Sequence, residues 1–387
     1  MIGTVRLSEV PSPGESTPPP HEAVAPLAFT QTRTIRIAIF AVAVAWMPTA
    51  SLAASHGFDA MRSFLTDCAA QSRLLVVIPL LIITEPLLAA RLMTIAHKFR
   101  DEGLVKEEDW PRFDKAIRSF EGGGGTLIAQ FMMLVLVYSF VASTISIIAA
   151  SPLMPWCFGP HGILTLSPAG SWYALVGFPM ILFVLLRWVW RQMLWLWFLI
   201  IVSGLDLQLI PAHPDRAGGL MFVEQCMWLY MPFSFAVGTI VGGGVANRVL
   251  YLRQSLTSFR YTPLAVIAIV VILCAGPLCV FWRTLRQSRS RGIFQYGVLA
   301  TSMGRQFEQQ WLTTPSNPRD DALKMPDFSA TIDLYSIVAN VQQTKTVPIG
   351  MRSIGRLAGA ALAPAMPLAL VVLPFDLIVK EVLKFLL

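Results

Sequence analysis

Charged residues are scarce in this sequence. Asp, Glu, Lys and Arg make up only 14% of its 387 residues, whereas 55% are hydrophobic, and the mean hydropathy is +0.61. So little polar surface cannot cover a soluble globule of this size. The composition therefore excludes an ordinary soluble protein and predicts a chain that the lipid bilayer covers.

Several chemical signatures are also lacking. The five cysteines show neither a C-x-x-C pair nor the Cys/His spacing of a zinc site. The sequence has no G-x-S-x-G and no H-E-x-x-H motif. The glycines at 122–125 precede Thr126 and Leu127 rather than the Lys and Ser/Thr of a phosphate-binding loop. We therefore expect no catalytic residue, no cofactor and no metal, and we lean against an enzyme.

The net charge of +7 would suggest nucleic acid in a soluble protein. Here most Lys and Arg residues flank apolar runs, where they hold loops on the cytoplasmic side. We interpret the basic balance as topology, with the lipid bilayer and anionic lipid head groups as partners and no nucleic acid. Arg289 and Arg291, next to a predicted span, are candidate lipid anchors.

Apolar runs long enough to cross a bilayer recur along the chain. They predict an all-α integral membrane protein, a polytopic helical bundle of about six to seven spans, with broken or re-entrant segments near 192–218 and 353–378. The predicted spans lie at about 34–54, 74–96, 126–150, 172–202, 219–246 and 263–282.

The remaining segments give the domain organisation. The predicted parts are a disordered Pro-rich cytoplasmic arm at 1–33, the first two spans at 34–96, a cytoplasmic amphipathic linker at 97–125, central spans at 126–282 with a polar turn at 203–218, a cytoplasmic helical segment at 283–352 that holds two apolar stripes, and a C-terminal apolar span or re-entrant segment plus an interfacial helix at 353–387.

Basic residues orient the bundle. The 97–125 segment is rich in Lys and Arg, whereas 151–171 contains none. This contrast predicts that 97–125 is cytoplasmic and that 151–171 is outside, and Arg33 and Arg36 before the first span predict a cytoplasmic N-terminus. The 247–262 loop conflicts with it, because simple counting places Arg248, Arg253 and Arg260 outside. Either the chain near 192–210 crosses or re-enters the membrane, or this loop departs from the positive-inside tendency.

Glu85 lies near the centre of the second predicted span and precedes Pro86. A carboxylate at bilayer depth costs about 3 kcal/mol, so it faces protein, a partner or water. Pro86 removes a helical hydrogen bond beside it. Glu85 is therefore either a proton or cation site or a paired group that joins helices.

Arg187 and Arg191 are four residues apart within a tryptophan-rich apolar run. On a helix they share one face. They mark either a helix end at the head-group level or a cavity within the protein that meets an anion or a carboxylate. Glu224, one to two turns into the next span, is a candidate partner for either arginine. We expect these groups to form one cytoplasmic polar cluster with a turn that contributes Asp206, His213, Asp215 and Arg216.

The stretch Leu205 to Leu220 reads L-D-L-x-L-x-P-x-H-P-D-R-A-G-G-L. It resembles the L-x-L-x-P-x-H-P-D-R-A-G-G-L signature of an uncharacterised family of bacterial multi-pass inner-membrane proteins. The resemblance covers mainly 185–225 and implies a bacterial inner membrane but no activity.

Two further patterns concern packing. Gly238 with Gly242, and Gly355 with Gly359, have the GxxxG spacing of close helix contacts, and we allow for a homo-oligomer. Cys68 and Cys157 fall in predicted outer loops, where a disulfide between them competes with the alternative of single buried thiols.

Three functions follow. The first is a channel or transporter for an ion or small solute, with a pathway through Glu85, Arg187, Arg191 and Glu224. The second is a non-catalytic membrane scaffold or sensor that docks a partner through 283–352. The third is a membrane enzyme on a phosphorylated or lipid substrate, with His213 or Asp215 as acid or base.

Overall fold

The computed structural model describes residues 24–123, 125–149, 155–157, 166–311 and 326–368. These residues form helices joined by turns, with one isolated bridge between Val105 and Leu207. The predicted polytopic helical bundle is confirmed. Six helical segments are long and apolar enough to cross a membrane: Gln31–Ser55, Cys68–Asp101, Leu127–Thr144, Pro168–Ser203, Met221–Tyr251 and Leu256–Gln309.

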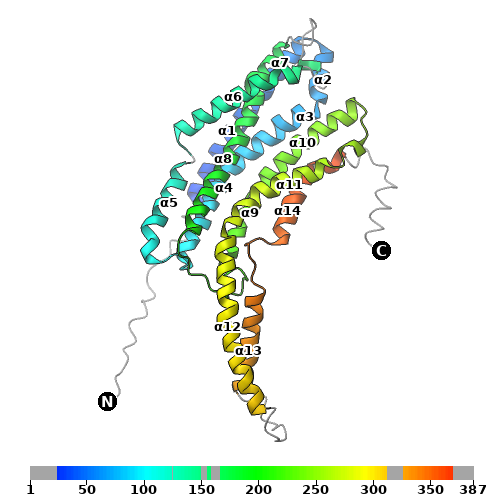
Figure 1. Ribbon diagram of the computed structural model, residues 1–387. Coiled ribbons are helices and arrows are strands. Elements are labelled where there is room, and N and C mark those ends of the chain that lie inside the picture. The colour runs from blue at the N-terminus through cyan, green and yellow to red at the C-terminus, as the bar shows by residue number, and fades with distance from the viewer. Residues whose placement is uncertain (1–23, 124, 150–154, 158–165, 312–325, 369–387) are drawn as a thin grey trace.

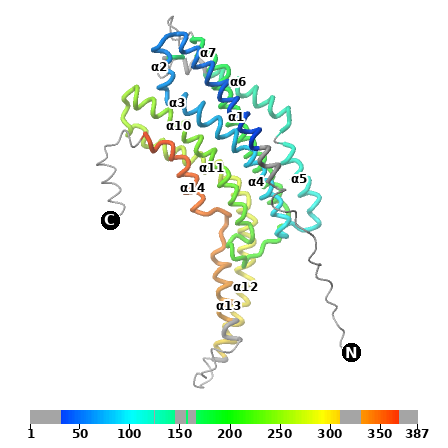
Figure 2. Tube along the Cα trace, turned by 180° about the vertical axis from the view of Figure 1, so that it is seen from behind, coloured from blue at the N-terminus to red at the C-terminus, as the bar shows by residue number. Residues whose placement is uncertain are grey.

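The spans run alternately up and down the bundle (Figures 1 and 2). One end, here called the hairpin end, holds the segment 102–109 and the connection at 204–220, whereas Gly123 lies further along the bundle, next to Trp190. The opposite end holds the connections at 56–67 and 252–261 and the described residues 155–157 and 166–167. In chain order the main helices are α1 (Val24–Ser55), α4 (Ile78–Asp101), α6 (Leu127–Ala149), α8 (Phe178–Ser203), α10 (Met231–Tyr251) and α11 (Thr262–Ala275).

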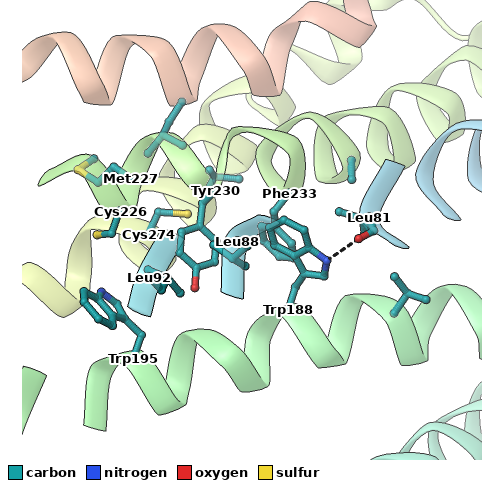
Figure 3. Packing of buried hydrophobic residues seen from close by; sticks show 14 of the residues in the cluster. Leu81, Leu88, Leu92, Trp188, Trp195, Cys226, Met227, Tyr230, Phe233 and Cys274 are labelled. Atoms are coloured by element: carbon teal, nitrogen blue, oxygen red, sulfur yellow. Dashed lines mark hydrogen bonds between the residues drawn. The ribbon is translucent and has the colours of Figure 1, made fainter. Parts of the chain in front are cut away.

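Helix α8 forms part of the bundle core. Its apolar residues recur on every side, as in helices that are buried or that span lipid. Trp188 and Trp195 are buried and point toward α4 and the start of α10 (Figure 3). The Trp188 ring stacks on Phe233 at 5.9 Å between centroids. These large side chains fix how α4, α8 and α10 pack.

Shorter helices cap the two ends. At the opposite end lie α2 (Phe58–Thr66), α3 (Cys68–Gln71) and α7 (Pro168–Trp172), and π-helical turns at Ser72–Val77 and Tyr173–Gly177 lead into α4 and α8. At the hairpin end, α5 (Trp110–Gly123) is the amphipathic helix that its sequence indicates. It buries Phe113, Ile117 and Phe120, and the Phe120 ring lies 5.6 Å from that of Trp195.

A helical hairpin extends away from the bundle at the hairpin end (Figure 1). Its first arm, α12 (Trp282–Trp311), continues α11 through the 3-10 turn Gly276–Phe281, and its second arm is α13 (Pro326–Gln342). The two expected helices do pack on each other. Leu334 and Val341, in the apolar stripe predicted for the second helix, are buried, whereas Phe294 and Val298, in the stripe predicted for the first, are exposed.

The predicted interruption near 192–218 begins only at Gly204. Helix α8 is continuous to Ser203, and 204–220 folds into a compact turn at the hairpin end. The second interruption is also present. Helices α9 (Gln225–Leu229) and α10 pack against α14 (Met351–Leu362), which gives way to a 3-10 turn at Ala363–Ala365. The arm predicted as disordered at 1–33 is wrong for its last part, because α1 begins at Val24. Its residues before 24, like the expected interfacial helix beyond 368, lie outside the described part of the chain.

The 252–261 loop lies at the opposite end of the bundle. It is next to 56–67 there, because Tyr251 Oη donates to the Thr66 carbonyl at 2.7 Å. Arg248, Arg253 and Arg260 therefore lie at the end that is otherwise poor in basic residues. Helix α8 continues unbroken to Ser203, so the chain does not cross separately near 192–203, and the side of the membrane on which the loop lies stays a prediction.

Candidate functional site

Glu85 and Arg187 form an ion pair in the interior of the bundle. Arg187 donates from Nε and from Nη2 to the same Glu85 oxygen, Oε1, at 3.0 and 2.7 Å. The Nη2 atom of Arg191 lies 4.0 Å from that oxygen. The Glu85 side chain is 13% exposed. Guanidinium donors thus take the place of water at this carboxylate oxygen.

The site lies near the middle of two spans. Glu85 is close to the centre of the Cys68–Asp101 segment, and Arg187 is close to the centre of Pro168–Ser203. A helix end at the head-group level would have placed the arginines at one terminus of the span. Helix α8 continues for about four further turns beyond Arg187, so the arginines are not at a helix end. Their depth in the bilayer stays a prediction, because a segment of 36 residues is longer than the bilayer and can project from it. Both arginines do meet a carboxylate within the protein, as the second alternative predicted.

Charge in this cluster does not balance. Two guanidinium groups face one carboxylate, and arginine stays protonated in proteins. Arg191 has a buried Nε without a hydrogen-bond partner in the described part of the chain. Burial raises the cost of such a charge. The cluster therefore carries one excess positive charge and a donor directed at no described acceptor.

Two neighbouring residues add unpartnered polar atoms. Gln192 donates from Nε2 to the Leu273 carbonyl at 2.8 Å, but its Oε1 is buried without a partner, as is the hydroxyl of Tyr230. Tyr230 points toward α8 between Trp188 and Trp195 (Figure 3). Most buried polar groups in native proteins are hydrogen-bonded. The unsatisfied hydroxyl of Tyr230, which interacts electrostatically with Arg191, and the buried Arg191 Nε indicate a place for water or a small polar ligand.

Glu224 does not belong to this cluster. We expected it to pair with Arg187 or Arg191, but both arginines lie next to Glu85. Glu224 instead accepts a hydrogen bond from Ser353 Oγ, which accepts one from Trp228 Nε1 at 2.7 Å. Ser353 is in the first turn of α14, where the helix dipole favours a carboxylate. Glu224 thus fixes α14 to the bundle.

The polar turn is a separate structural unit. Asp215 accepts hydrogen bonds from the backbone N–H groups of Ala217, Gly219 and Met221 at 2.8, 3.2 and 3.1 Å. His213 Nδ1 lies 2.8 Å from the same carboxylate. Burial raises the pKa of Asp215, but these hydrogen bonds outweigh it and hold the pKa below its ordinary value. The carboxylate closes the turn.

Other residues of the turn face different partners. Asp206 pairs with Lys106 at the surface, and the Asp206 side chain is 74% exposed. Arg216 has a φ of 56°, and its carbonyl accepts a hydrogen bond from Lys345 N at 2.7 Å. The predicted single cytoplasmic cluster is therefore wrong. The turn joins the 343–350 connection to the bundle, and the ion pair lies deeper.

A third polar group, at the opposite end, was not anticipated from sequence. Asp67 is 2% exposed and accepts hydrogen bonds from Ala70 N, Trp156 Nε1 and Asn247 Nδ2 at 2.9, 2.9 and 2.7 Å. An Asp directly before a helix is a common N-cap residue, so its capping role at α3 could have been predicted from the sequence. Nothing in the sequence near Trp156 or Asn247 indicates that they are its hydrogen-bond partners.

The cysteines in this region are free. Cys68 and Cys157 do not form the disulfide that we considered, and Cys157 is buried. Burial raises the pKa of the Cys157 thiol to about 12, and the Asp67 carboxylate adds to this effect. The alternative of single buried thiols holds. Within the described ranges, no group of His, Cys, Asp and Glu could hold a metal ion.

These features define an all-helical multi-pass membrane protein with a buried Glu/Arg cluster. The chain matches no family model, no curated protein and no solved structure. Its function is therefore argued from the site alone.

Proposed function

We propose that the protein is a channel or transporter that binds a small anion at Glu85, Arg187 and Arg191. The observation that carries this proposal is the excess guanidinium charge at mid-span, beside a buried Arg191 Nε without a partner. Ionisable groups at this depth are costly and commonly mark ion or solute pathways. An anion would neutralise the excess charge and accept from the unpartnered donor.

The two arginines differ in burial. The Arg187 side chain is 34% exposed, whereas that of Arg191 is 17% exposed. We propose that the anion meets Arg187 first and Arg191 second. The ion pair with Glu85 holds Arg187 in place, so Glu85 acts as a positioning residue.

We further propose a bacterial inner membrane with the hairpin end in the cytoplasm. This end has many basic residues, as cytoplasmic loops do. The signature at Leu205 to Leu220 supports the same compartment. The basic residues are Lys98, Arg100, Lys106, Arg112, Lys115, Arg118, Arg283, Arg286, Arg289 and Arg291.

Flux measurements in proteoliposomes test the proposal. Purified protein is reconstituted, and the uptake of radiolabelled chloride, acetate and inorganic phosphate is driven by a membrane potential. We expect at least one anion to enter faster than in protein-free vesicles. Arg191→Gln should lower this uptake at least tenfold, while Arg91→Gln, an exposed arginine of α4, leaves it unchanged. Uptake equal to that of empty vesicles for all three anions contradicts the proposal.

A second candidate function is a membrane scaffold that docks a protein through 283–352. The α12–α13 hairpin favours it, because Phe294 and Val298 are 74% and 59% exposed outside the bundle. Exposed apolar side chains on a projecting helix pair are typical of interaction surfaces. Phe294→Ser with Val298→Ser should release a partner that co-purifies with the wild type. If every co-purifying protein stays bound, this function is lost.

A further inference from the structure

Two cavities meet at the opposite end of the bundle, away from the Glu85 cluster. The first, of about 210 Å³, lies between α10, α11 and α14. The second, of about 330 Å³, lies between α10 and the start of the second span. Both are lined by Val241, Val245, Phe259 and Thr262. Because they share these lining residues, the two cavities adjoin, and they are taken here as the two unlike halves of one candidate site.

The first half is an apolar groove. Small residues on facing helices leave this groove open. A Cβ atom added to Gly242 of α10 would lie no closer than 3.9 Å to Ala365. One helical turn earlier, Gly238 contacts the Ala361 backbone closely and closes the groove. Pro263 and Val266 of α11 complete the apolar wall. A groove of this kind suits a hydrocarbon chain.

The second half is basic. Arg73 and Arg248 line the second cavity, and Arg260 lines the adjoining part of the first. The nearby carboxylate, Asp67, already accepts hydrogen bonds from Ala70, Trp156 and Asn247. The guanidinium groups are thus in excess, and a phosphate or carboxylate would complement them.

Asn247 adds an unsatisfied acceptor to this basic half. The residue is 2% exposed and lines the second cavity. Its Nδ2 donates to Asp67, which fixes the amide orientation, and its buried Oδ1 has no partner among the described residues. A buried amide oxygen without a donor is costly. It indicates a ligand that carries a hydroxyl or amine close to its anionic group.

The position of the arginines is itself informative. Arg248, Arg253 and Arg260 lie at the end of the bundle where basic residues are otherwise few, against the usual distribution. Two of the three, Arg248 and Arg260, line the joined cavities. A binding role gives a physical reason for their presence on this side.

We infer that the joined cavities bind an anionic amphiphile. Its chain lies in the groove at Gly242, its phosphate or carboxylate lies between Arg73 and Arg248, and its hydroxyl or amine donates to Asn247 Oδ1. A phospholipid with an anionic, hydroxyl-bearing head group has this chemistry. The site is independent of the anion site at Glu85.

Native mass spectrometry of the detergent-solubilised protein tests this inference. The protein is titrated with phosphatidylglycerol, with phosphatidylcholine of the same chains, and with inorganic phosphate alone. We expect phosphatidylglycerol to bind at least tenfold more tightly than phosphatidylcholine. Arg248→Gln should remove most of this preference. Arg253→Gln, in the same loop but outside both cavities, is the matched control and should keep it.

A second pair of variants tests the groove. Gly242→Phe and the milder Val245→Phe should fill it and weaken phosphatidylglycerol binding at least tenfold, with Tm measured to show that each variant folds. Equal binding of the two lipids overturns the inference. Inorganic phosphate that competes at the same concentration as the lipid, together with no effect from either groove variant, shows a free-anion site and also overturns it.

Discussion

Asn247 of α10 donates a hydrogen bond to Asp67, 180 residues earlier in the chain, at 2.7 Å. The same carboxylate accepts from Trp156 Nε1 at 2.9 Å and caps α3 through Ala70 N. One buried side chain thus connects the second span, the connection at 155–157 and the fifth span. Because all three donors are buried with it, they have no water to replace it.

Replacement of Asp67 should destabilise the whole bundle. Asp67→Ala leaves three buried donors without an acceptor, and each unsatisfied group costs about 1–3 kcal/mol, so we expect a loss of roughly 3 kcal/mol in the free energy of unfolding. Unfolding in mixed detergent micelles, followed by circular dichroism, measures it. Asp59→Ala, at an exposed position of α2, is the control. A loss below about 1 kcal/mol contradicts this prediction.

The sequence predicted the class of fold because hydropathy is a local property. A run of apolar residues crosses a bilayer whatever its neighbours are, so six spans and the amphipathic α5 were visible. The partner of each buried charge is a long-range property. Glu85 and Arg187 both stand out in the sequence, but they are 102 residues apart. From sequence alone, Glu224 was an equally good candidate partner for Arg187.

The sequence pattern was also misleading where a polar side chain only stabilises the turn that contains it. His213, Asp215 and Arg216 are concentrated in one polar stretch, which is typical of an active site as well as of a tight turn. The carboxylate oxygens of Asp215 accept hydrogen bonds from backbone N–H groups of the same turn. Hydropathy does not describe hydrogen bonds between a side chain and the backbone. The sequence alone therefore could not show that the polar turn and the Glu85–Arg187 ion pair are two separate sites.

The ion pair between Glu85 and Arg187 predicts a coupled loss of stability. Glu85→Gln leaves two guanidinium groups without a counter-charge, and loss of one partner of a fully buried pair costs about 3–5 kcal/mol. Because Arg187 is 34% exposed, we expect roughly 2 kcal/mol. The double variant Glu85→Gln, Arg187→Gln should recover part of this loss in a double-mutant cycle. Strictly additive single losses would show that the pair is not coupled.

Acid should weaken the polar turn through Asp215. Its pKa in the folded protein lies below the ordinary value of 3.8. Its contribution to stability is therefore complete above that value and is lost as the pH falls through the folded pKa. Asp215→Asn should lower Tm near neutral pH, with a loss of about 1–2 kcal/mol, and the difference from wild type should shrink below about pH 4. A difference that stays constant to about pH 3 would exclude the carboxylate charge as its cause.

The Cys157 thiol should resist labelling in the folded protein. With a pKa of about 12, only about one thiol in ten thousand is ionised at about pH 8, and the side chain is buried. A variant that keeps only Cys157 should gain no maleimide-polymer gel shift until denaturant is added. A variant that keeps only the half-buried Cys68 provides the comparison and should label faster. Rapid native labelling of Cys157 would show that the 155–157 connection opens.

The two GxxxG pairs should respond very differently to substitution. A Cβ on Gly238 would lie 1.9 Å from the Ala361 carbonyl oxygen, whereas on Gly355 or Gly359 it would meet no described atom within 4 Å. Close packing was predicted for both pairs, and of the four glycines only Gly238 shows it in the described part of the chain. Gly238→Ala must move the backbone of α14, so we expect a loss of about 3 kcal/mol. Gly359→Ala should be neutral or stabilising by about 0.5 kcal/mol, because alanine favours helix. Detergent unfolding of the two variants side by side decides the matter, and a Gly238→Ala protein as stable as wild type would mean that α14 does not lie against α10 at this point.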